Sequence, residues 1–124
     1  MRTETSPSSA SELARRLYTT FIAGDRPAME ALLADDFTFT SPQDDHIDKS
    51  EYFVRCWPHR DQLRNLEIET LFAEDNAAFV RYSAERVADG VRFRNTEYVV
   101  CEGGRVKSVE VYFGATTNTP PSAK

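Results

Sequence analysis

The first part of the chain carries apolar residues at helical spacing. Leu13, Leu17 and Phe21 recur every four residues, which predicts a helix with one buried stripe. Ser9, followed three residues later by a glutamate, is a capping-box pattern for the start of this helix. Gly24 fits its end, because glycine readily accepts the left-handed conformation that closes a helix.

Two shorter helices and one strand are predicted next. Asp25 can cap a helix whose first turn contains a proline. The alternation of apolar and polar residues over 37–41 predicts a strand that Pro42 ends. Asp48 begins a second capping-box pattern, and the helix behind it is expected to stop at Pro58.

The second half of the chain has the two-residue period of β-strands. Strands are predicted over 66–71, 78–87, 91–102 and 106–113. Because the helices precede a run of antiparallel strands, the order predicts an α+β fold with a curved antiparallel sheet around three N-terminal helices. We expect one domain over 9–114, a disordered N-terminus over 1–8 and a flexible tail over 115–124.

A predicted hairpin turn at Asp89-Gly90 indicates which side chains face the interior. A two-residue turn places Tyr82 opposite Glu97, and directly opposed residues share one face of a sheet. The more apolar face is expected inside. Its predicted members are Val80, Tyr82, Ala84, Phe93, Asn95, Glu97, Val99 and Cys101.

Glu97 stands out as a carboxyl group on this apolar face. A buried carboxylate is costly, so the group either stays protonated or finds hydrogen-bond donors, and Tyr82 and Asn95 are the expected partners. Such a carboxyl can act as a general acid or base near neutral pH. The other interpretation is a satisfied polar residue of the core, and the sequence leaves both open.

The inward face of the last strand is open between two choices. Val109 inward is the more apolar choice and requires an odd-length turn at Gly103-Gly104. A two-residue turn would place Glu110 opposite Glu97 and make a pair of carboxylates. We expect the first arrangement.

The acidic segment between the first strand and the third helix carries His46. An imidazole at the mouth of a pocket can serve as a base near neutral pH, and the alternative is an exposed loop histidine. The residues Asp44, Asp45, His46 and Asp48 match no known metal-ligand spacing, and Asp48 is needed as a helix cap. We therefore expect neither a metal nor a cofactor.

Composition and charge narrow the class of protein. A hydrophobic fraction of 40% indicates a globular chain, and a net charge of −5 argues against non-specific nucleic-acid binding. No run approaches the ~18 apolar residues of a membrane span, and the serine-rich start lacks the apolar region of a signal peptide. We expect a cytoplasmic protein that binds neither nucleic acid nor membrane.

The chain resembles the nuclear-transport-factor-2-like superfamily, which includes ketosteroid isomerases and SnoaL-like polyketide cyclases. Three segments carry the resemblance: Phe21–Asp25, Leu32–Phe37 leading into Ser41-Pro42, and Gly104–Gly114. It covers roughly residues 9–114 and implies a cystatin-like, cone-shaped fold with a pocket for a small molecule. The fold alone does not determine the function, since it hosts enzymes, binders and scaffolds.

The functional residues of the ketosteroid isomerases are matched only in part. The position of their general-base aspartate is Ser41 here, and that of their oxyanion tyrosine is Leu17, with Tyr18 one residue away. Their protonated oxyanion acid best matches Glu97, after a gap of one residue. The resemblance therefore does not imply steroid isomerisation.

Together these patterns predict a pocket protein for a small apolar ligand that bears at least one oxygen. The predicted catalytic residues are Glu97, Tyr82 and His46, and a catalytic form would be a cofactor-free isomerase, cyclase, dehydratase or hydrolase. The predicted ligand-binding residues are Phe39, Ser41, Phe53, Trp57, Val80, Asn95, Val99 and Val109. The alternative is a non-catalytic ligand-binding or homodimerisation module, with the dimer formed through the outer sheet face around Tyr98.

Overall fold

The computed structural model describes residues 9–116. The predicted disordered N-terminus and residues 117–124 of the predicted tail lie outside the described residues. Ala115 and Thr116, which the prediction placed in the tail, belong instead to the last strand. Within 9–116 no helix is long and apolar enough to cross a membrane.

The helices begin and end close to the residues that the sequence indicates. They are α1 (Ala10–Ala23), α2 (Arg26–Leu32), α3 (Lys49–Arg55) and the 3₁₀ helix η1 (Trp57–Gln62). Ser9 forms the predicted capping box of α1, and Asp25 and Asp48 cap α2 and α3 through their side chains. Gly24 closes α1 in the left-handed conformation, with φ at 69°. The caps are thus confirmed, but α3 stops at Arg55, before the expected Pro58.

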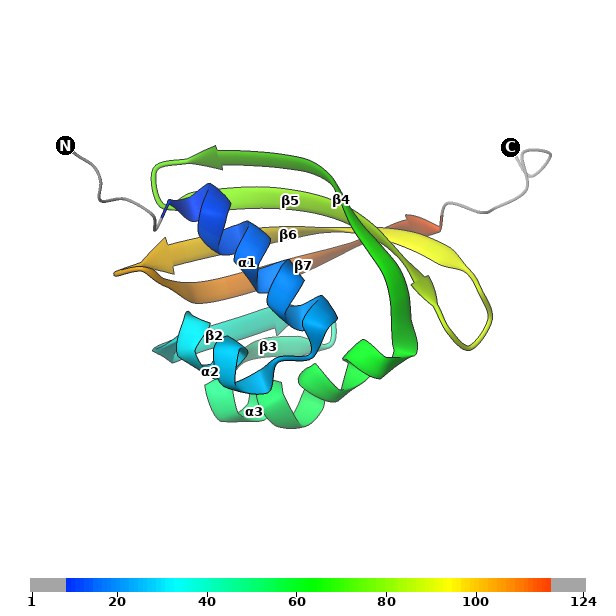
Figure 1. Ribbon diagram of the computed structural model, residues 1–124, viewed down its shortest axis with the longest axis horizontal. Coiled ribbons are helices and arrows are strands. Elements are labelled where there is room, and N and C mark those ends of the chain that lie inside the picture. The colour runs from blue at the N-terminus through cyan, green and yellow to red at the C-terminus, as the bar shows by residue number, and fades with distance from the viewer. Residues whose placement is uncertain (1–8, 117–124) are drawn as a thin grey trace.

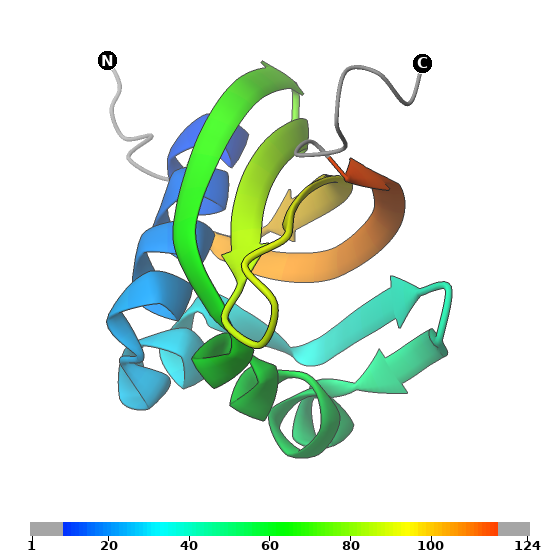
Figure 2. The same cartoon turned by 90° about the vertical axis from the view of Figure 1, so that its right-hand side faces the viewer.

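Over residues 9–116, one six-stranded sheet forms the other layer, in the order β3-β2-β7-β6-β5-β4. The strands are β2 (Leu33–Ser41), β3 (Asp44–Asp48), β4 (Leu63–Glu74), β5 (Ala77–Arg86), β6 (Arg92–Glu102) and β7 (Arg105–Thr116). Only the β2–β7 pairing within this sheet is parallel. Figures 1 and 2 show the strongly bent sheet with α1 against its concave side. This arrangement confirms the predicted α+β class.

The acidic segment between β2 and α3, where a loop histidine was one of the two alternatives, forms the strand β3. After a tight turn at Pro42-Gln43, β3 folds back on β2 and pairs Phe39 with Ile47. This pairing places β3 at the edge of the sheet, where charged side chains are favourable because they discourage further strand pairing.

The β5–β6 hairpin differs from the prediction in register but not in face. Val80 lies opposite Glu97, and Tyr82 lies opposite Asn95, a shift of two residues. The loop is wider than two residues because Asp89 accepts from the Val91 backbone N–H at 3.1 Å and also pairs with the Arg86 side chain. A slip of two residues preserves the alternation of side chains, so the predicted interior face survives.

Val109 on the last strand faces inward, as expected, but the turn that precedes this strand differs from the prediction. The turn at Gly103-Gly104 has two residues, since Glu102 pairs with Arg105. A register shift between Val100 and Cys101 then moves the pairing by one residue. Val111 therefore lies opposite Glu97, and a bulge in the strand does what an odd-length turn was expected to do.

Candidate functional site

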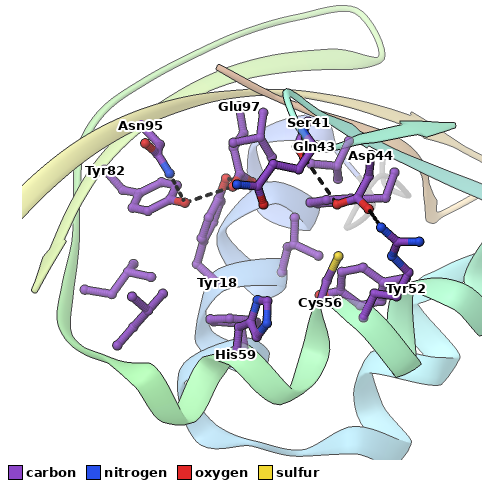
Figure 3. Close-up of a pocket in the computed structure, with 18 of the residues that line it drawn as sticks. Tyr18, Ser41, Gln43, Asp44, Tyr52, Cys56, His59, Tyr82, Asn95 and Glu97 are labelled. Carbon is purple, nitrogen blue, oxygen red and sulfur yellow. Dashed lines mark hydrogen bonds and ion pairs between the residues drawn. The ribbon is translucent and has the colours of Figure 1, made fainter. Parts of the chain in front are cut away.

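A cavity of about 200 Å³ lies between the concave side of the sheet and the helices. Its walls come from all four helices and from the strands, so segments distant in sequence meet there (Figure 3). Its apolar lining includes Leu17, Phe21, Phe37, Phe39, Leu66 and Val109. Small-molecule sites are commonly about 300–1,000 Å³ and mostly apolar, so the volume suits a compact ligand.

Glu97 projects into this cavity from β6 and is the centre of a hydrogen-bonded cluster. Its side chain is buried, and Tyr18 donates to Oε1 at 2.5 Å while Tyr82 donates to Oε2 at 3.0 Å. Asn95 donates through Nδ2 to the Tyr82 hydroxyl at 3.1 Å, and its own Oδ1 accepts from the Gly114 backbone N–H at 3.4 Å. Tyr82 is therefore the direct partner that was predicted, and Asn95 acts through Tyr82.

Burial dominates the electrostatics of this cluster. Loss of solvation raises the pKa of Glu97, and the hydrogen bonds from Tyr18 and Tyr82 offset part of that rise. Burial, followed by the charge of Glu97, raises the pKa of both phenols well above their usual value. The tyrosines therefore stay neutral donors, while Glu97 gains or loses its proton at a higher pH than an exposed glutamate.

Tyr18, a direct hydrogen-bond partner of Glu97, was not among the predicted site residues. The alignment with ketosteroid isomerases pointed to Leu17, yet both Leu17 and Tyr18 lie on the buried side of α1 and line the cavity. A helix that packs against a concave sheet contacts it over a wide arc, so two adjacent residues can both point inward. The sequence did hold one signal for Tyr18: a tyrosine on the buried side of a helix usually has a hydrogen-bond partner for its hydroxyl.

Of the predicted site residues, a majority of those on strands line the cavity. They are Phe39, Ser41, Tyr82, Asn95, Glu97 and Val109. Val80 and Val99 point to the same side of the sheet, but both are fully buried in the core and do not line the cavity. The prediction that these two valines form walls of the cavity is therefore wrong, because core side chains fill that part of the cone.

Phe53 and Trp57 also lie outside the cavity lining, against the prediction. The Phe53 ring packs under the Arg26 guanidinium, 4.5 Å from its centroid. Trp57 meets Phe21 edge to face, with the ring centroids 5.9 Å apart. These aromatics join α3 and η1 to the neighbouring helices, and Tyr52 from α3 faces the cavity in their place.

The histidine of the site is His59 and not His46. His46 lies on β3 with φ at 51°, its side chain 67% exposed and its Nδ1 at 2.6 Å from Asp45 Oδ1. His59 is an exposed residue that lines the cavity from η1 (Figure 3). The next residue, Arg60, holds η1 in place by donating to the Phe21 carbonyl at 3.0 Å.

An ion pair forms part of the cavity wall near the β2–β3 turn. The Asp44 carboxylate lies 2.7 Å from Arg55 Nη2 and accepts from Ser41 Oγ at 3.3 Å. The buried Oδ1 atom of Asp44 meets Arg55 as an ionic partner without a well-directed hydrogen bond. Asp44 is thus a part of the cavity wall whose charge is balanced by Arg55.

Cys56 contributes a thiol to the cavity but not a nucleophile. Burial, with the nearby charge of Asp44, raises the pKa of Cys56 to about 12. The reactive form of cysteine is the thiolate, which this environment disfavours. Among residues 9–116, no group of three or more His, Cys, Asp or Glu side chains is placed to hold a metal ion.

Comparison of the sequence with protein families gives one match over most of the chain. The family model for the SnoaL-like domain matches residues 14–109, which include Tyr18, Tyr82 and Glu97. No curated protein is significantly similar to the chain in sequence.

Solved structures with the same fold come from several bacteria. An NTF2-like protein of unknown function from Cytophaga hutchinsonii matches with a TM-score of 0.69 at 21% identity, over 91% of this chain and 94% of that one. A protein from Kribbella flavida, provisionally named a ketosteroid isomerase, gives 0.72 at 20% identity, over 90% and 82%. An LEH-like epoxide hydrolase from M. tuberculosis gives 0.69 at 15%, over 84% and 81%. These likenesses show the NTF2-like fold.

Proposed function

Since the chain belongs to the SnoaL-like domain family of the NTF2-like superfamily, we propose that its cavity binds a small, mainly apolar molecule with at least one oxygen, and that Glu97 moves a proton on it. One observation carries the proposal. The Glu97 carboxyl is buried in a largely apolar cavity and is oriented by two tyrosine hydroxyls. Burial raises its pKa. These are the properties of a general acid or base that works near neutral pH.

The chemistry needs no cofactor. The ionised carboxylate takes a proton from a carbon next to the ligand's carbonyl group, and the electrons of the broken C–H bond form an enolate. When a C=C bond is conjugated with the enolate, the protonated carboxyl returns the proton to the far carbon of the conjugated system and the double bond moves, which is an isomerisation. When the β-carbon carries a hydroxyl group, the carboxyl protonates that group as the C–O bond breaks, water leaves and the enolate electrons form a C=C bond, which is a dehydration. Each Glu97 oxygen accepts one tyrosine hydrogen bond, so a second lone pair remains for this transfer.

The names of the structural relatives support this class of reaction without choosing within it. One is provisionally named an isomerase and another an epoxide hydrolase, and both reactions require a proton to move at an oxygen-bearing small molecule. The position of the ketosteroid isomerase base is Ser41, whose hydroxyl donates to Asp44. Asp44 is paired with Arg55, so among residues 9–116 Glu97 is the cavity carboxyl that is not in an ion pair. We therefore infer the ligand class from the chemistry of the cavity and not from the resemblance to ketosteroid isomerases.

Deuterium exchange tests the proposal directly. The protein is incubated with a panel of cyclic ketones and enones in D₂O, and NMR follows the replacement of hydrogen next to the carbonyl. We expect Glu97→Gln to lower the exchange rate at least about 100-fold, the usual worth of a general base. Glu110→Gln is the matched control, because Glu110 lies on β7 opposite Tyr98, on the other face of the sheet. Equal rates in the wild type and Glu97→Gln would refute the catalytic form.

A second candidate function is a homodimer that binds a ligand without transforming it. The outer sheet face carries exposed aromatic residues, with Phe72 75%, Phe79 50% and Tyr112 53% exposed. Tyr98 stacks on Phe79 with the ring centroids 4.7 Å apart. Such a strip favours packing of one sheet on another. Light scattering should give a dimer mass that Phe79→Lys reduces to the monomer; a wild-type monomer contradicts this candidate.

A further inference from the structure

Tyr52, the third tyrosine of the cavity, differs from the other two in the hydrogen bonding of its hydroxyl group. Tyr18, Tyr52 and Tyr82 all line the cavity, and the hydroxyls of Tyr18 and Tyr82 donate to Glu97. The Tyr52 hydroxyl has no hydrogen-bond partner among residues 9–116, although the residue is only 6% exposed. Among residues 9–116, Asp44 Oδ1 is the only fully enclosed side-chain oxygen or nitrogen without a hydrogen-bond partner, so the Tyr52 hydroxyl is open to the cavity and not sealed in the core. An unpaired phenol aimed into a cavity is therefore a candidate contact for a ligand.

The ring of Tyr52 is held firmly while its hydroxyl remains unpaired. The ring packs against Phe37, Phe39 and Phe53 at centroid distances of 5.5, 5.4 and 5.3 Å. The α3 helix that carries Tyr52 is fixed at its start by the Asp48 cap. The hydroxyl is thus set in position before any ligand arrives, which lowers the entropic cost of binding.

The other donors of the cavity are either occupied or less enclosed. Arg55 is paired with Asp44, and the Ser41 hydroxyl also donates to Asp44. The Gln43 side chain has no hydrogen-bond partner within the described residues, but it is exposed at the β2–β3 turn. Figure 3 shows Tyr52 on the α3 side of the cavity and Glu97 on the sheet side. A ligand between them can reach one group with its oxygen and the other with its reacting carbon.

We propose that the Tyr52 hydroxyl is the hydrogen-bond donor for the carbonyl oxygen of the ligand, while Glu97 acts on the adjacent carbon. This inference rests on the proposed function and names the ligand class as a compact carbonyl compound. Proton removal next to a carbonyl places negative charge on its oxygen, and a donor fixed at that oxygen stabilises the charge as it develops. Burial keeps the Tyr52 phenol neutral, and hence a donor, by raising its pKa.

A pair of probe molecules isolates this hydrogen bond. Cyclohexanone and methylenecyclohexane have nearly the same shape, but the second has a CH₂ group where the first has the carbonyl oxygen. Calorimetric titration of each probe gives a ratio of dissociation constants for the wild type and for the variants Tyr52→Phe, Tyr98→Phe and Gln43→Met. The carbonyl ¹³C shift of labelled cyclohexanone reports the hydrogen bond independently, and loss of ring packing alone would not mimic its change.

We expect the wild type to bind cyclohexanone about fivefold to tenfold more tightly than methylenecyclohexane, as one net hydrogen bond allows. Tyr52→Phe, which keeps the ring, should bring the ratio near one and reverse the carbonyl shift. Tyr98→Phe, on the outer face, should change neither. If the preference persists in Tyr52→Phe or disappears only in Gln43→Met, the Tyr52 assignment is wrong while the cavity remains a ligand site. If neither probe binds the wild type, the proposed function and this inference both fail.

Discussion

Two glutamates on neighbouring strands show how the face of a sheet decides the chemistry of a side chain. Glu97 on β6 is enclosed, and within the described part of the chain it accepts hydrogen bonds only from the phenols of Tyr18 and Tyr82. Its pKa is raised because burial removes its hydration. Glu85 on β5 lies on the outer side, where Arg64 donates to it at 2.9 Å. The hydrogen bond from Arg64, then that from Asn65, lowers the pKa of Glu85. One residue type thus has a raised pKa on one face of the sheet and a lowered pKa on the other.

The largest expected effect comes from removing both phenol donors of Glu97. The double variant Tyr18→Phe/Tyr82→Phe keeps the rings but leaves an enclosed carboxylate without its two donors. Hydrogen bonds to charged groups contribute about 1.5–3 kcal/mol each, so we expect a loss of roughly 3–6 kcal/mol in unfolding free energy at pH 8. Urea denaturation measures the loss, and adding Glu97→Gln to the double variant should recover part of it. No recovery would mean that the cost lies in packing and not in the charge.

An intermediate effect is expected in the pH dependence of stability. The folded-state pKa of Glu97 is raised above its usual value of 4.5, so its favourable contribution is complete below pH 4.5 and is lost as pH rises through the folded-state pKa. The wild type should therefore lose stability relative to Glu97→Gln across this range, by about 1.4 kcal/mol for each unit of the rise in pKa. Urea midpoints between pH 4 and 8 test this difference.

The opposite trend is expected at the outer glutamate. The folded-state pKa of Glu85 is lowered, so its contribution is present above the usual value of 4.5 and is lost as pH falls through the folded-state pKa. The wild type should thus gain stability relative to Glu85→Gln as pH rises. Parallel trends for the Glu97→Gln and Glu85→Gln comparisons would undo the contrast between the faces.

The smallest effect is expected where the outer ion pair is broken. Arg64→Ala removes the partner of Glu85, but both groups are in contact with solvent and such pairs contribute little. We expect the urea midpoint at pH 7 to move by less than a quarter of the shift seen for the tyrosine double variant. The same variant in 1 M salt should be indistinguishable from the wild type, because salt screens exposed charges. A shift as large as that of the inner variant would show that the outer face is not a solvated surface.

Sequence patterns were sufficient for the local elements and for the faces of the strands. Caps depend on neighbouring residues only, which is why Ser9, Asp25 and Asp48 could be assigned from their local spacing. The alternation along β5 and β6 placed Glu97 and Tyr82 inside even though the predicted register was wrong by two residues. An error of two residues returns each side chain to its own face, so this conclusion was robust.

The composition of the cavity depended on tertiary structure. Tyr18 reaches Glu97 across 79 positions of the chain, and His59 rather than His46 enters the cavity because η1 folds beneath it. Periodicity says which side of an element is apolar, but not where along that side the core ends and a hollow begins. Val80 and Val99 fill the core while Val109 borders the cavity, although all three point inward.

The sequence by itself determined the α+β class, the helix boundaries set by caps and the inward direction of one carboxyl group, because these follow from contacts between residues close in the chain or from simple alternation. Tertiary structure alone decided that two tyrosines from different elements would hold that carboxyl and that a third would remain unpaired beside it. The bend of the sheet and the seating of α1 and α3 against it set those distances, and they result from packing over the whole domain.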